Sequence, residues 1–299
     1  MKILIIGSKG FIGSHAYQYF KNMGQYITYA SDIVNDYNDS NYFQISSSDA
    51  DFNSLFRKIK PDWCINCSGA ASVANSFLNP LKDFSLNVNN LHKILFTIKE
   101  EAAHCKLIQL SSAAVYGNPT LLPIEETSAL HPLSPYGLHK KQAEELCALY
   151  HDNFGVSSYI IRIFSAYGNG LKKQLFWDLY QKLNSPAPII QLFGSGDESR
   201  DFIHVKDVVS CFELIIKKVT ASFDIFNLAN GHQITISNVA TMFKELGNFN
   251  DKKIEFIGNN RIGDPLHWEA GIGKISKLGY QNQISLEAGL SDYISWLKD

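Results

Sequence analysis

The chain has 299 residues, of which 45% are hydrophobic and 19% are charged, and its formal net charge at pH 7 is -2. This length and composition suffice for one large domain or two modest ones with a sizeable core. The near-neutral balance, without a run of basic residues, argues against nucleic acid and anionic membranes as partners and favours small ligands.

The distribution of apolar residues and cysteines predicts a cytoplasmic protein. No apolar stretch approaches the roughly 18 residues of a membrane span, and the amino terminus reads as a strand rather than a signal sequence. The five cysteines are odd in number and scattered, which is typical of a reducing compartment. Cys64 and Cys67 have the spacing of metal ligands, but residues three apart on a strand point to opposite faces, so we expect no metal site.

Apolar runs alternate with helical segments up to about residue 165. Strands are predicted at Lys2–Ile6, Tyr26–Ala30, Trp63–Cys67, Leu107–Leu110 and Ser158–Ile163. Helices are predicted after Gly10 and over Asp51–Lys58, Leu81–Lys99 and Tyr136–Phe154. This order predicts an α/β fold with a doubly wound parallel sheet, which binds ligands at the carboxyl ends of its strands. We expect a dinucleotide-binding domain over 1–165 and a smaller α/β substrate-binding lobe over 166–299, with some chain crossing back.

A glycine-rich turn follows the first strand and predicts a dinucleotide site. Gly7 permits a tight turn, Gly10 lets the backbone approach a pyrophosphate, and Gly13 lets the next helix lie close to the strand. The amino end of that helix favours the anion. Asp32 stands after the second strand, where an acid can accept hydrogen bonds from both hydroxyls of an adenosine ribose. For the glycines alone, an ordinary strand-turn-helix is the alternative.

A serine-bearing strand end and a tyrosine-lysine pair predict acid-base chemistry. Ser111 and Ser112 follow the strand over Leu107–Leu110, at the same edge of the sheet as the glycine turn. Tyr136 and Lys140 lie four apart on one helical face. Because an ammonium ion favours a phenolate, we expect Lys140 to lower the pKa of Tyr136 from its usual value of about 10.

These features resemble the extended short-chain dehydrogenase/reductase family, in the branch that epimerises, reduces or dehydrates nucleotide-linked sugars. The resemblance covers nearly the whole chain. It rests on five motifs, namely Gly7-x-x-Gly10-x-x-Gly13, Ser111 to Gly117, Tyr136-x-x-x-Lys140, Arg162 to Gly168, and Arg200 to Asp207. The resemblance implies that Tyr136 is the general acid/base, that Ser112 holds the same substrate oxygen, and that Lys140 binds the nicotinamide ribose and tunes Tyr136.

The pattern and the resemblance together give a predicted set of site residues. The cofactor-binding residues are Gly7, Lys9, Gly10, Phe11, Ile12, Gly13, Asp32, Ile33, Ser68, Gly69, Ala70, Asn87, Ser111, Tyr136 and Lys140. The substrate-binding residues are Ser72, Ser112, Ser165, Arg200 and Arg261, and the resemblance implies that the two arginines pair with a nucleotide diphosphate. A polar residue placed like Asn87, among apolar neighbours on a helix, is more often a structural tie across the sheet than a catalyst.

Departures from the family pattern reduce the number of reactions and cofactors that the sequence supports. Ala113 and Ala114 stand where the 4,6-dehydratases carry an acidic pair, so we set dehydration aside. Lys9 resembles the basic residue that NADP-using relatives place against the 2′-phosphate, whereas Asp32 would face that phosphate with like charge and favours NAD. Ser165 stands where many epimerases have asparagine.

Three functions remain open at this point. The first is an NAD-dependent nucleotide-sugar epimerase that works by hydride transfer through a transient 4-keto sugar. Its alternative is an NADPH-dependent 4-ketoreductase of a 4-keto-6-deoxy nucleotide sugar, and the third is a non-catalytic dinucleotide sensor. The resemblance also implies a homodimer that pairs through the helices over Leu81–Lys99 and Tyr136–Phe154.

Overall fold

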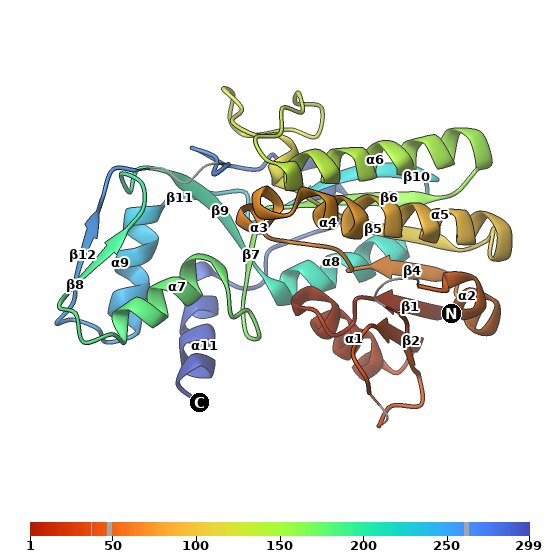
Figure 1. Cartoon of the computed structure of the whole chain (residues 1–299), viewed down its shortest axis with the longest axis horizontal. Coiled ribbons are helices and arrows are strands. Elements are labelled where there is room, and N and C mark those ends of the chain that lie inside the picture. The colour runs from red at the N-terminus through yellow and green to blue at the C-terminus, as the bar shows by residue number, and fades with distance from the viewer. Residues whose placement is uncertain (37, 47–49, 260–262) are drawn as a thin grey trace.

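The computed structural model describes residues 1–36, 38–46, 50–259 and 263–299. Its larger sheet has seven parallel strands in the order β10-β6-β5-β4-β1-β2-β3 (Figure 1). These strands are β1 (Lys2–Ile6), β2 (Ile27–Asp32), β3 (Tyr42–Gln44), β4 (Trp63–Asn66), β5 (Lys106–Ser112), β6 (Ser158–Ile163) and β10 (Phe223–Leu228). The predicted α/β class with a doubly wound parallel sheet is confirmed.

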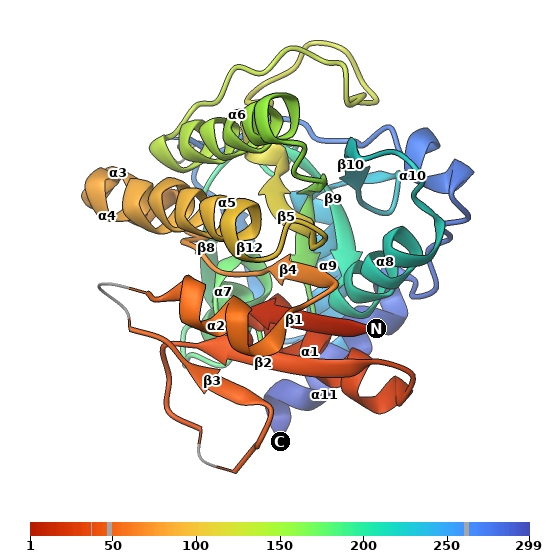
Figure 2. The same ribbon diagram turned by 90° about the vertical axis from the view of Figure 1, so that its right-hand side faces the viewer.

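Helices cover both faces of this sheet (Figure 2). One face carries α1 (Phe11–Met23) and α8 (Val205–Lys218), and the other carries α2 (Phe52–Ile59), α5 (Asn90–Glu101) and α6 (Pro135–Phe154). Side chains alternate along a strand, so β1 serves both layers: Ile3 and Ile5 pack with α1 and α8, while Leu4 and Ile6 pack with α2 and α5. Burial on both faces explains why β1 reads as a continuous apolar run.

A smaller lobe lies at the carboxyl edge of the sheet (Figure 1). Its strands are β7 (Ser165–Tyr167), β8 (Ile189–Leu192), β9 (Ser199–His204), β11 (Gln233–Thr235) and β12 (Lys253–Phe256), which form the sheets β11-β9-β7 and β12-β8. Its helices α7 (Gln174–Leu183), α9 (Ile236–Leu246) and α11 (Leu286–Lys298) share a separate apolar core. Since α8 and β10 return to the large sheet, chain after residue 165 serves both parts. The domain boundary at 165 stays a prediction.

Three elements differ from their predicted extents in ways that affect the site. β2 runs on to Asp32 instead of ending at Ala30, and β5 runs on to Ser112 instead of ending at Leu110. The single helix predicted over Leu81–Lys99 is three segments, namely α4 (Pro80–Phe84), a π-helical turn (Ser85–Asn89) and α5. In that turn the N–H of Asn90 donates to the carbonyl of Ser85, five residues back.

The described residues also form two short helices, α3 (Val73–Leu78) and α10 (Gly273–Lys277), and a 3-10 turn over Ala113–Val115 after β5. Across the part of the chain that the structure describes, no helix has both the length and the apolar character needed to cross a membrane.

Candidate active site

A cavity of about 600 Å³ lies between the carboxyl ends of the large sheet's strands and the small lobe. The predicted site residues that line it are Gly10, Phe11, Ile12, Ser68, Gly69, Ala70, Ser72, Ser111, Ser112, Tyr136, Lys140, Ser165 and Arg200. Gly7, Lys9, Gly13, Asp32, Ile33 and Asn87 are not part of this lining. Arg261 lies outside the described residues. One cavity therefore joins the predicted cofactor turn, the tyrosine-lysine pair and one predicted diphosphate arginine.

The glycine turn leaves no room for side chains at two positions. Gly7 has φ +79°, and a Cβ placed there would lie 2.6 Å from the backbone nitrogen of Ser68. A Cβ on Gly13 would lie 2.0 Å from the carbonyl oxygen of Gly7. No side chain caps the amino end of α1 at Gly10, so the N–H groups of its first turn remain available to an anion. This cradle fits the pyrophosphate of a dinucleotide.

Asp32 is held at the end of β2 by two backbone hydrogen bonds. Its Oδ2 accepts from the N–H of Lys9 at 2.8 Å, and its Oδ1 accepts from the N–H of Ile33 at 2.7 Å. The ammonium of Lys9 forms an ion pair with Asp36. Asp32, the acid predicted to bind the ribose, is thus fixed beside the glycine turn. Lys9, which in the sequence favours NADP over NAD, has a carboxylate partner.

Ser112, Tyr136 and Lys140 meet at the wall of the cavity. Ser134 caps the amino end of α6, because its Oγ accepts from the N–H of Gly137 at 3.1 Å. The Tyr136 hydroxyl is hydrogen-bonded to the Ser112 side chain. Lys140 donates from Nζ to the carbonyl of Leu110 at 3.1 Å, and this Nζ lies 5.8 Å from the centroid of the Tyr136 ring. The structure therefore brings together the three residues that the sequence proposes for catalysis.

The expectation that the pKa of Tyr136 is lowered is wrong for the protein chain by itself. Burial raises the pKa of Tyr136 to about 12, and the hydrogen bond from Ser112 offsets only part of this rise. Burial also lowers the pKa of Lys140 to about 8. Spacing on a helix says nothing about burial, which is the largest cause of both shifts. Proton transfer by Tyr136 thus requires additional stabilisation of its phenolate when the site is filled.

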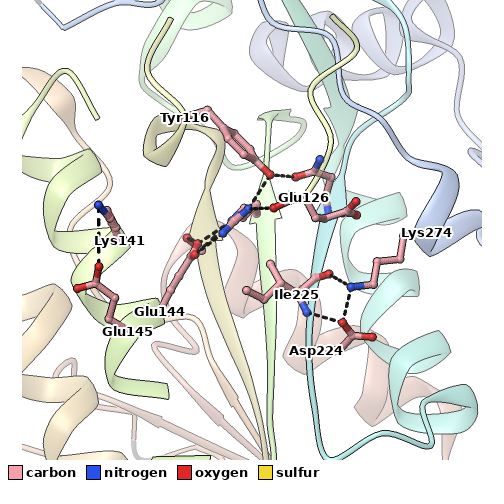
Figure 3. Close-up of polar contacts among 11 residues, drawn as sticks. Tyr116, Glu126, Lys141, Glu144, Glu145, Asp224, Ile225 and Lys274 are labelled. Carbon is pink, nitrogen blue, oxygen red and sulfur yellow. Dashed lines mark hydrogen bonds and ion pairs between the residues drawn. The ribbon is translucent and has the colours of Figure 1, made fainter. Parts of the chain in front are cut away.

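Ser111 and Ser112 point in opposite directions because both belong to β5. Ser111 donates from Oγ to Glu144 at 2.5 Å, and Arg162 binds the same carboxylate through Nη2 at 2.7 Å and Nε at 3.0 Å. Arg162 also donates to the Tyr116 hydroxyl at 2.8 Å (Figure 3). This buried network joins β5, β6 and α6 behind the cavity, so the hydroxyl of Ser111 serves the framework.

Asn87 lies in the helical layer rather than across the sheet. Its Nδ2 donates to Asp83 Oδ1 at 3.1 Å, and the same oxygen lies 2.6 Å from Nδ1 of His139 on α6. A Cβ on Gly69 would lie 2.5 Å from Asn87 Oδ1, so Asn87 backs the cavity wall at Gly69. The predicted tie across the sheet is wrong, because Asn87 binds Asp83, one turn earlier in the same helical layer. Its cofactor role stays a prediction.

The far end of the cavity has a different composition. Arg200 donates from Nη1 to the carbonyl of Ser199 at 2.8 Å, and its guanidinium lies 5.6 Å from the centroid of the Trp268 ring. Ser72 caps α3, and Ser165 begins β7. Sequence reasoning missed Trp268 and Lys173, which also line this cavity. No local motif marks either residue, because long-range folding of the small lobe places them there.

A dinucleotide cradle that shares one cavity with a serine, a tyrosine and a lysine defines a dinucleotide-dependent enzyme. A family model described as the NAD dependent epimerase/dehydratase family matches residues 3–229. The chain belongs to this family, which confirms the resemblance drawn from the motifs, the enzymatic character and the NAD cofactor.

Individual relatives match over nearly the full chain. A protein of Methanocaldococcus jannaschii, provisionally named UDP-glucose 4-epimerase, is 27% identical over 99% of this chain and 98% of its own. The UDP-glucuronate 4-epimerase of Thermodesulfobacterium geofontis is 27% identical over 79% of this chain and 72% of its own. The crystal structure of a Bacillus cereus UDP-glucuronic acid 4-epimerase with UDP-glucuronic acid and NAD has a TM-score of 0.90 at 25% identity and covers 100% of this chain and 99% of its own.

Proposed function

We propose that this protein is a nucleotide-sugar 4-epimerase that works with NAD through a transient 4-keto sugar. The observation that carries the proposal is the hydrogen-bonded pair of Tyr136 and Ser112 in the same cavity as Arg200. Such a cavity provides an acid-base group for a sugar hydroxyl and, farther along, a cation for a diphosphate. The names of the relatives, which are UDP-sugar 4-epimerases, support the same substrate class.

Some of these residues transfer the proton, and others anchor the substrate. Tyr136 takes the proton of the C4 hydroxyl while Ser112 holds that oxygen, and Lys140 stabilises the phenolate form. When bound beside the glycine turn, NAD would supply the hydride acceptor and donor for C4 of the sugar. Arg200, together with Arg261, holds the diphosphate. Anchoring through the diphosphate leaves the keto sugar free to turn between the two hydride transfers, which epimerisation requires.

Two other reactions of the family have less support. Ala113 and Ala114 form the start of the turn after Ser112, and neither can protonate a leaving hydroxyl or remove a carbon-bound proton. The sequence argument for an NADPH-dependent ketoreductase combined Lys9, Ser165 and the compact chain, and the ammonium of Lys9 pairs with Asp36. We therefore favour epimerisation, which returns its electrons to the substrate and consumes no reduced cofactor.

We also propose a homodimer formed by the helical layer of α4, α5 and α6. Large apolar side chains are exposed on these helices, at Leu81, Phe96, Leu138 and Leu149. The helices α5 and α6 lie side by side on one face of the molecule (Figure 2). A two-fold axis over this face would cover these side chains in a four-helix bundle. We further propose that residues 1–165 bind the cofactor, that 166–299 mainly bind the substrate, and that the protein works in the cytoplasm.

The test offers NAD-loaded protein three substrates, UDP-glucose, UDP-glucuronic acid and UDP-N-acetylglucosamine, and measures the C4 epimer by NMR. We expect one of them to be interconverted, with a deuterium label at C4 retained in the product because the hydride returns to the same carbon. Tyr136→Phe should lower kcat at least about 1,000-fold, since it removes the acid-base group. Tyr159→Phe is the matched control, because its hydroxyl bonds to the carbonyl of Ala221, away from the cavity.

Two results would contradict the proposal. One is the absence of interconversion with all three sugars in protein that holds NAD. The other is exchange of the C4 label with solvent, which would exclude a hydride that is taken and returned.

A further inference from the structure

The side chain and the backbone of Lys9 are both held by carboxylates at the end of β2. Its N–H donates to Asp32 at 2.8 Å, and its ammonium pairs with Asp36. The ammonium also lies 5.0 Å from the centroid of the Tyr42 ring. The Lys9 side chain thus extends from the glycine turn to Asp36, in the segment after β2, and to the ring of Tyr42.

The surroundings of this pair are fixed by buried contacts. Tyr42 of β3 is 9% exposed, and its hydroxyl donates to the carbonyl of Val34. Burial raises the pKa of the Tyr42 hydroxyl most, and the charges of Asp32 and Asp36 raise it further, so both carboxylates lie near this hydroxyl. A third acid, Asp39, is committed elsewhere, since it accepts from Lys21 at 2.8 Å and from the Tyr17 hydroxyl at 2.5 Å.

The charges at this edge oppose a phosphorylated ribose. Two carboxylates, Asp32 and Asp36, face a single ammonium, that of Lys9. NADP differs from NAD only in a 2′-phosphate, which as a phosphate monoester carries about -1.5 to -2 charges at pH 7. A lysine between the glycines would suit that phosphate, but recruiting it requires breaking its ion pair and leaving Asp36 beside a like charge.

We propose that Asp36 is a second specificity-determining residue for the cofactor: by pairing with Lys9 it withholds the ammonium from the ribose 2′ position and, with Asp32, makes the site select NAD over NADP. Asp32 provides the acceptor for the ribose hydroxyls, and Asp36 suppresses the cation that would otherwise compensate for a 2′-phosphate. The inference goes beyond the epimerase reaction, because it concerns cofactor choice alone.

The test measures equilibrium binding of NADH and NADPH to the full-length protein after removal of bound nucleotide, by the fluorescence of the reduced nicotinamide. Asp36→Asn should lower the Kd for NADPH about tenfold, because it frees the Lys9 ammonium and removes a like charge. The Kd for NADH should change less than about twofold. In the double variant Lys9→Gln/Asp36→Asn most of the gain for NADPH should disappear, since the gain requires the ammonium.

The matched control is Asp39→Asn, which removes a neighbouring carboxylate that pairs with Lys21 instead of Lys9. It should leave the ratio of the two Kd values unchanged. Asp36→Ser repeats the test without an amide, and thermal unfolding shows that each variant is folded. An unchanged ratio in Asp36→Asn, an equal gain in Asp39→Asn, or a gain that persists without Lys9 would each overturn the inference. No sugar or turnover enters the measurement, so its failure leaves the proposed epimerase function untouched.

Discussion

The two ends of the cavity are built on different physical principles. At the end with Tyr136 and Lys140, Lys140 is buried and Tyr136 is half-buried, and the buried residues Arg162, Glu144 and Ser111 form a hydrogen-bonded network behind them. At the end with Arg200, the guanidinium donates hydrogen bonds to the backbone carbonyls of Ser199 and Leu266 and lies against the ring of Trp268. The proposed chemistry end therefore has a buried arginine-carboxylate network behind it, whereas the arginine proposed to bind the substrate charge is held by backbone carbonyls and an aromatic ring.

This comparison predicts opposite outcomes for two arginines, and the larger effect belongs to Arg162. Arg162→Met leaves Glu144 as an unpaired buried carboxylate and should lower the free energy of unfolding by about 3–5 kcal/mol. Lys274→Met is the control, because Lys274 pairs with Asp224 at a site where both side chains are partly exposed (Figure 3). Loss of that pair should cost less than about 1 kcal/mol. Urea unfolding of both variants measures the difference, and equal losses would show that burial of the pair is unimportant.

Arg200→Gln should spare stability and impair binding. Loss of charge-assisted hydrogen bonds to a diphosphate should raise KM about 10- to 100-fold and leave kcat within a few-fold, because the arginine anchors the substrate away from the reacting carbon. The free energy of unfolding should change by less than about 1 kcal/mol, in contrast to Arg162→Met. The control for loss of a positive charge is Arg57→Gln, because Arg57 of α2 forms a partly exposed pair with Glu101 of α5. A fall in kcat with unchanged KM would place Arg200 in the chemistry instead.

The sequence could predict the parts of the site that depend on local chain geometry. The glycines lie within one turn between a strand and a helix, and Tyr136 and Lys140 lie on one helix, so spacing alone brings each group together. The sheet followed from alternating apolar runs, because strands buried on both faces are apolar throughout.

Other parts depend on contacts between distant segments, which spacing does not encode. The direction of Ser111 follows from how far β5 extends and from Glu144 on α6, thirty-three residues away. The surroundings of Asn87 depend on His139 of α6, which shares Asp83 with it, and on the loop at Gly69, and both are distant in sequence. The small lobe, with strands of three to six residues in two sheets, offers too little periodicity to be assigned from sequence.

The smallest predicted effect is a pH dependence of the free energy of unfolding, which tests whether Lys140 is buried beside Tyr136. The pKa of Lys140 in the folded chain is about 8, below its ordinary value of 10.5, because burial disfavours the ammonium. Between these two values the unfolded chain binds more protons than the folded one, so this group makes the free energy of unfolding rise with pH. The difference in unfolding free energy between wild type and Lys140→Met should therefore grow in favour of wild type by about 1–2 kcal/mol from pH 7.5 to 9.5. Lys141→Met, at the exposed neighbour that pairs with Glu145, should show no such trend. Urea unfolding at several pH values measures this difference. A constant difference would mean that the ammonium of Lys140 is as well solvated as one at the surface. The contrast between the two ends of the cavity would then not hold for Lys140.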